Sequence, residues 1–99
     1  MKERRLLCTR RLLSPERREE YDAAWTRLHA AATAGGAKAW RFVSEARGDV
    51  YVEFLEFAAE HDPREDAEAN AALLALEAAF GEPPPPPEAI EELRSIAGE

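Results

Sequence analysis

Arg41, Tyr51 and Glu53 are the residues whose chemical types best suit a binding or catalytic site. A guanidinium and a phenol can orient a small ligand that carries a carbonyl or phenolic oxygen, and a carboxylate can act on it as a general base. The three are therefore the candidate ligand-binding residues, and Glu53 is the candidate base. The structural alternative is a cross-strand ion pair between Arg41 and Glu53 with the tyrosine at its rim.

The remaining reactive side chains do not form a recognisable set. His29 and His61 are the only histidines and Cys8 is the only cysteine, and none of them has a neighbour at the spacing that metal ligation requires. We therefore expect no metal and no cofactor. A single cysteine excludes an internal disulfide and suits a reducing compartment, so the expected location is cytoplasmic.

The charges are distributed unevenly along the 99 residues, whose net charge is −7. Seven of the 13 basic residues lie in the first 18 positions, and 13 acids lie from Glu53 onward. We interpret the basic start as the complement of the acidic second half, within or between subunits. Nucleic acid is not an expected partner, because the overall charge is acidic and no recognition motif is present. A membrane is not expected either, because no apolar run approaches about 20 residues.

Hydrophobic spacing and capping residues predict five elements in the order strand, helix, strand, strand, helix. Ser14-Pro15 begins the first helix and Gly35 ends it, whereas Asp62-Pro63 begins the second helix and Gly81 ends it. The predicted strands are residues 4–13, 38–46 and 50–58. The last two form a hairpin around Arg47-Gly48-Asp49.

The segment after Gly81 is unusual because it contains five consecutive prolines, Pro83–Pro87. Such a run forms a stiff polyproline II spacer of about 15 Å. Ile90, Leu93 and Ile96 then predict a short amphipathic helix. The expected organisation is an α+β domain (1–81), a spacer (82–87) and a C-terminal helical tail (88–99). The tail either docks on the sheet edge or on a partner subunit, with Arg10 or Arg11 facing its acids, or recognises another protein.

The hairpin predicts two different sheet faces. With a three-residue loop, one face carries Trp40, Phe42, Ser44, Val50, Val52 and Phe54. The opposite face is mixed and carries Arg41, Val43, Glu45, Tyr51, Glu53, Leu55 and Phe57. We expect the apolar face to receive the helices and the mixed face, which is still too apolar for water, to be covered by a second subunit.

The β-α-β-β-α order and the aromatic third strand VYVEFLEF resemble the dimeric α+β barrel superfamily of ferredoxin-like fold, of the antibiotic-biosynthesis-monooxygenase-like and stress-responsive barrel type. The resemblance covers residues 4–81. The usual fourth strand is missing, because prolines occupy its place. The resemblance implies an antiparallel sheet with helices on one face, and a homodimer.

Two functions follow from these observations. The first is a dimeric module for assembly, small-ligand binding or regulation. The alternative is a cofactor-independent barrel enzyme that acts on an aromatic or polyketide-type small molecule. An enclosed cavity around Arg41, Tyr51 and Glu53 favours the enzyme, whereas tight packing there favours the module.

Overall fold

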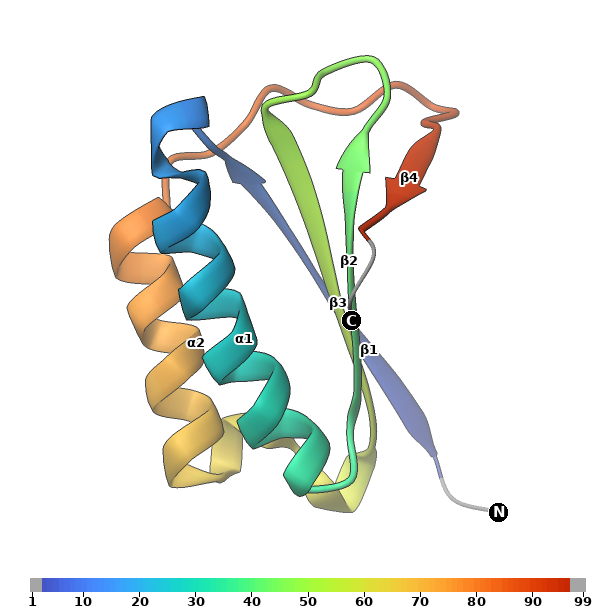
Figure 1. The fold of residues 1–99 in the computed structure, drawn as a ribbon. Coiled ribbons are helices and arrows are strands. Elements are labelled where there is room, and N and C mark those ends of the chain that lie inside the picture. Colours follow the sequence, from blue (N-terminus) through green and yellow to red (C-terminus); the bar gives the residue numbers. More distant parts are fainter. Residues whose placement is uncertain (1–2, 97–99) are drawn as a thin grey trace.

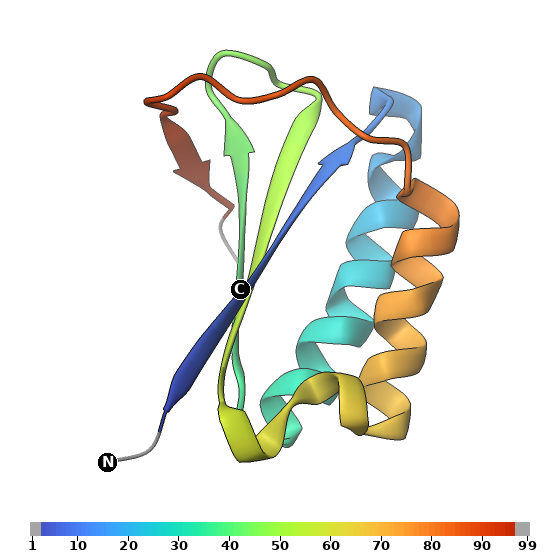
Figure 2. The ribbon, with the colours of Figure 1, turned by 180° about the vertical axis from the view of Figure 1, so that it is seen from behind.

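Two helices form one layer that covers one face of a four-stranded antiparallel sheet (Figures 1 and 2). The computed structural model describes residues 3–96. The elements are β1 (Arg4–Leu12), α1 (Arg18–Ala34), β2 (Lys38–Ser44), β3 (Val50–Ala58), α2 (Ala67–Phe80) and β4 (Leu93–Ser95). The predicted α+β class, with its antiparallel sheet and its helices on one face, is confirmed.

The strand order across the sheet is β1-β3-β2-β4. β3 pairs antiparallel with both β1 and β2, so it lies between two parallel strands that α1 connects. This is a split β-α-β unit. The hairpin pairs Trp40 with Phe54 and Arg41 with Glu53, so even positions face even positions as predicted. Its loop spans residues 45–49 rather than three residues, because β2 ends at Ser44.

Both helices begin later than their prolines predicted, because each proline starts a short 3₁₀ turn instead. Asp62 caps the turn Pro63–Glu65 by accepting from the backbone N–H of Arg64. Asp66 then caps α2, with its Oδ2 accepting from the backbone nitrogen of Ala69 at 2.8 Å. A second aspartate four residues downstream therefore takes the role expected of Asp62.

The helices cover the mixed face of the sheet, so the predicted assignment of the two faces is wrong. Tyr51, Leu55 and Phe57 of β3 are at most 6% exposed and pack in the core with Trp25 and Leu28 of α1. This face is buried although it carries charged residues. Each charged residue that is buried there has a partner of opposite charge. The even-numbered face is left without helices.

The predicted C-terminal helix is also wrong. Residues 88–96 contain no helix, and β4 supplies the fourth strand that the sequence appeared to lack. β4 pairs Leu93 with Ser44 and Ser95 with Phe42. The edge of β2 offers unpaired backbone groups, and their hydrogen bonds hold the tail extended: the nitrogen of Glu45 donates to the Glu92 oxygen at 3.0 Å. Residues 97–99 of the predicted tail lie outside the described residues.

Candidate functional site

The three predicted site residues lie on one face of neighbouring strands, but that face is the one under the helices. Arg41 of β2 stands opposite Glu53 of β3, and Tyr51 is two residues away on the same face. Arg41 and Tyr51 are each 6% exposed and Glu53 is 3% exposed. The structure therefore brings the three residues to one region, in the packed layer between sheet and helices.

Glu53 is held by two donors from other elements. Its Oε2 accepts from the Arg11 Nε of β1 at 2.8 Å and from the Tyr21 hydroxyl of α1 at 2.8 Å. Arg11 also donates from Nη1 to Glu77 of α2 at 3.1 Å. Burial, together with the charge of Glu53, raises the pKa of Tyr21 far above its ordinary value, so its phenol stays neutral and donates.

Arg41 and Tyr51 take part in a second set of contacts with α1. Arg41 Nη1 donates to Asp22 Oδ1 at 2.6 Å, and Arg18 Nε donates to the same oxygen at 2.9 Å. Arg18 Nη1 lies 2.7 Å from the Tyr51 hydroxyl. Although partial burial raises the pKa of Asp22, the hydrogen bonds from Arg18 and Arg41 hold it below its ordinary value. We call these two sets together the buried polar cluster.

The buried polar cluster ties the helices to the sheet. Sequence reasoning missed Arg11, Tyr21 and Asp22 as members of it. For Arg11 a signal was present, since it alternates with Leu7 and Leu13 along the first strand and so shares their face. Glu53 is bonded by groups of the protein itself and is not accessible from solvent, so this arrangement positions elements rather than exposing a base.

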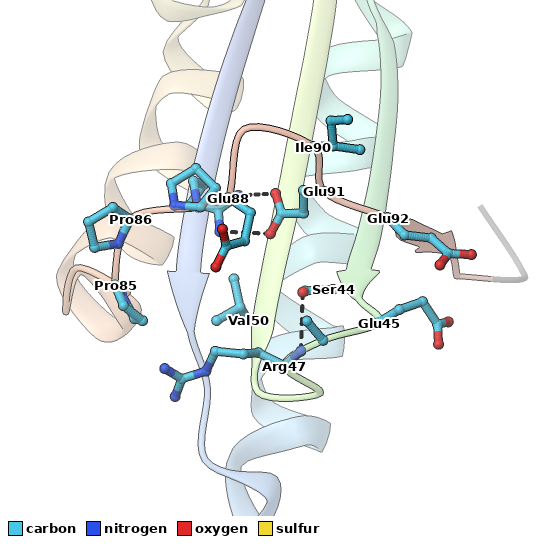
Figure 3. Close-up of a pocket in the computed structure, with 13 residues that line it drawn as sticks. Ser44, Glu45, Arg47, Val50, Pro85, Pro86, Glu88, Ile90, Glu91 and Glu92 are labelled. Carbon is cyan, nitrogen blue, oxygen red and sulfur yellow. Dashed lines mark hydrogen bonds and ion pairs between the residues drawn. The ribbon is translucent and has the colours of Figure 1, made fainter.

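A pocket of about 570 Å³ lies on the other face of the sheet, at the end where β1 and β2 finish (Figure 3). Its roof is the segment 82–92, which we call the strap. The strap runs from α2 across the end of the sheet to β4 (Figures 1 and 2). The floor includes Val50 and Ser44, and the roof includes Pro85–Pro87, Ile90 and Glu91.

A bidentate ion pair fastens the strap to β1. Arg10 Nη1 donates to Glu91 Oε1 at 2.7 Å, and Arg10 Nη2 donates to Oε2 at 3.1 Å. The hydrogen bond from Arg10 holds the pKa of Glu91 below its ordinary value. Of the two residues expected to face an acid of the tail, Arg10 does so within one chain, whereas Arg11 is bonded to Glu53 and Glu77.

The face without helices, which we call the open face, keeps apolar side chains in contact with water. Leu6 is 57% exposed and Trp40 is 40% exposed, and Cys8 is also exposed. Phe42 and Phe54 are half-buried and meet edge to face, with their ring centroids 5.6 Å apart. These five side chains form a continuous strip along β1, β3 and β2.

Comparisons with known proteins do not assign this chain to a family: no family model, no curated protein and no solved structure matches it. Within residues 3–96, no three His, Cys, Asp or Glu side chains converge as a metal site would require. His29 packs beside Trp25, and His61 is exposed. Over the same residues, the helices are too short or too polar to cross a membrane.

Proposed function

We propose that this protein is a homodimerising module in which two copies pack their open faces against each other. The observation that carries the proposal is the exposed apolar strip on a sheet whose helices within residues 3–96, α1 and α2, cover the opposite face. Contiguous apolar surface of this kind marks an association site in proteins that are otherwise well packed. We choose a second copy as the partner, because under two-fold symmetry the same apolar patch on each copy covers the patch on the other.

The uncovered part of the open face is the half around Leu6 and Trp40, because the strap lies over the other end. β1 and β3 have nine residues each, which corresponds to a length of about 30 Å. A stable interface buries about 800 Å² on each partner, roughly an eighth of the 6209 Å² accessible surface of this chain. Leu6 and Trp40 are 57% and 40% exposed, so covering them contributes only the corresponding part of the roughly 1.5–3 kcal/mol that full burial of each side chain gives.

The packing of the predicted site residues supports a module over an enzyme. A general base must reach the proton that it removes, directly or through one water molecule. Glu53 is 3% exposed, and its Oε2 accepts from Arg11 and Tyr21. This environment suits a group that joins elements, and the proposal therefore assigns the function to the surface.

Light scattering coupled to size exclusion at micromolar concentration tests the proposal. The expected mass is twice the 11.0 kDa of one chain. Leu6→Glu introduces a charge into the proposed interface and is expected to shift the protein to monomer without unfolding it, because this side chain is already 57% exposed.

Leu74→Glu is the matched control. Leu74 lies on α2 and is 58% exposed, so the same substitution adds the same charge at equal exposure on the other side of the molecule. It is expected to leave the dimer intact. A wild-type protein that runs as a monomer, or two variants that dissociate equally, contradicts the open face as the interface.

A further inference from the structure

The two ends of the open face differ in charge. At the end where β1 and β2 begin, Arg4 and Lys38 lie on the open face near Glu56 of β3. Arg4 forms an ion pair with Glu56 at 3.1 Å, and its side chain remains 45% exposed. One carboxylate thus stands against two cations. We call Arg4 and Lys38 the basic end.

The strap makes the opposite end acidic. Of its three glutamates near the sheet, Glu91 is paired with Arg10. Glu88 and Glu92 are exposed, and neither forms an ion pair within the described part of the chain. Figure 3 shows Glu88 in front of the strands, on the side of the open face, whereas Glu92 lies at the edge of the sheet beside β2, opposite Glu45 in the register of β4. We call Glu88 and Glu92 the strap acids.

The basic end and the strap acids are too far apart to neutralise each other within one chain. Along β3, Glu56 and Val50 are separated by six residues, or about 20 Å. This is more than twice the screening length of about 8 Å at physiological ionic strength. Both charges therefore remain available to a partner.

We infer that two copies pack their open faces with their strands running in opposite directions, so that the strap acids of each copy lie against the basic end of the other. The inference rests on the proposed homodimer and adds its orientation. A two-fold axis in the plane of the interface permits either arrangement, since the strands of the two copies can run in the same or in opposite directions. Parallel packing brings acid against acid and base against base, whereas antiparallel packing pairs opposite charges twice.

The shape of the strap favours the same arrangement. The strap lies over Val50 and Ser44 at one end of the open face and leaves the half around Leu6 and Trp40 uncovered. In parallel packing the two straps meet at the same end and hold the sheets apart. In antiparallel packing the two straps lie at opposite ends of the dimer. Each strap is then next to the basic end of the partner, and the two uncovered halves meet.

A charge reversal on the strap tests the orientation. The strap variant carries Glu88→Lys and Glu92→Lys. We expect its dimer dissociation constant to rise about tenfold or more in 50 mM salt and the difference to shrink in 0.5 M salt, because exposed charges are screened. The matched control, Glu19→Lys with Glu68→Lys, changes the net charge equally at two exposed positions on the helices and is expected to dimerise like the wild type.

A fully inverted chain decides between the two orientations. The inverted variant adds to the strap variant the substitutions Arg4→Glu, Lys38→Glu and Glu56→Lys, which keep the cross-strand pair with its signs exchanged. Antiparallel packing predicts that this variant regains the wild-type dissociation constant with itself but is excluded from mixed dimers with the wild type. Mass spectrometry of a mixture with one isotope-labelled partner measures the exclusion, and the melting temperature of each variant reports that it is folded.

The possible outcomes distinguish a wrong orientation from a wrong homodimer. A strap variant that dimerises normally, or an inverted variant that prefers the wild type over itself, overturns the antiparallel orientation while the dimer stands. If the wild type is already a monomer at micromolar concentration, the homodimer itself fails.

Discussion

The two faces of this sheet have exchanged the roles that their compositions suggest. The face under the helices carries Arg11, Arg41 and Glu53 at 6% exposure or less, whereas the open face keeps Leu6 and Trp40 in water. Burial of charged groups is favourable only when each has a partner. Arg11 and Glu53 pair with each other across β1 and β3, and the helices add contacts from Tyr21, Asp22 and Glu77.

This difference shows that the polarity of a face does not by itself decide which side becomes the core. A mixed face can be buried when its charges are matched by the elements that cover it. A more apolar face can stay without helices, as the face with Leu6 and Trp40 does.

Removal of one member of the buried polar cluster is expected to cost the most. Glu53→Ala leaves Arg11 buried without the carboxylate that it contacts at 2.8 Å. The expected loss is about 3–5 kcal/mol of unfolding free energy, as for other buried pairs that lose one partner. Urea denaturation measures it.

The control removes an exposed carboxylate instead. Glu45→Ala breaks the pair with Arg94, whose side chains are 42% and 67% exposed, and is expected to cost about 1 kcal/mol or less. Equal losses for the two variants would show that the cluster is no more important to stability than a surface pair.

The same leucine truncation on the two faces is expected to give unequal results. Leu55→Ala on the covered face, where the side chain is 3% exposed, is expected to cost about 2–5 kcal/mol. Leu6→Ala on the open face is expected to change the unfolding free energy of the monomer by about 0.5 kcal/mol or less. Denaturation at concentrations low enough to dissociate a dimer separates folding from association. A large cost for Leu6→Ala under these conditions would contradict an open face in the monomer.

The fold could be predicted from the sequence wherever the signals are local. Prolines, glycines and apolar spacing gave the five main elements in the right order, and the hairpin was predicted with the correct parity. The choice of face could not be predicted, because it depends on which helix side chains meet Arg11 and Glu53 across long sequence separations. The tail was predicted as a helix, because Ile90, Leu93 and Ile96 fit helical spacing, yet the free edge of β2 determines its structure.

In the candidate site, too, local features could be predicted and contacts between distant parts of the chain could not. Arg41, Tyr51 and Glu53 were correctly placed on one face, because alternation along a strand is a local property. Their burial, and the participation of Tyr21 and Asp22, depend on how α1 packs on the sheet. The strap pocket was not predicted, since it needs the path of the chain after Gly81. A contact between an acid of the tail and Arg10 or Arg11 was predicted from charge complementarity alone, which did not decide between the two arginines.

Within residues 3–96, the strap is the one segment that crosses from the covered side to the open face, and its removal is expected to cost less than the loss of Glu53 or of the Leu55 side chain. A chain that ends at Gly81 loses β4, the Arg10–Glu91 pair and the half-buried Leu93. Neither helix nor any of the three long strands is removed. We expect a loss of about 1–2 kcal/mol, which lowers the melting temperature of a domain this size by about 5–10 °C.

Association of the truncated chain is expected to weaken as well, since the strap acids are lost with it. Arg10→Ala separates the contribution of the strap to folding from its contribution to association. It breaks the ion pair that holds the strap to β1 while leaving β4 and both strap acids in the chain. It is expected to lower the melting temperature by less than the truncation does and to change the dimer dissociation constant little. Calorimetry and light scattering on the three proteins measure both effects. A truncated chain that melts and associates like the full chain would show that the strap contributes to neither face, and that it serves instead as a recognition arm for another protein.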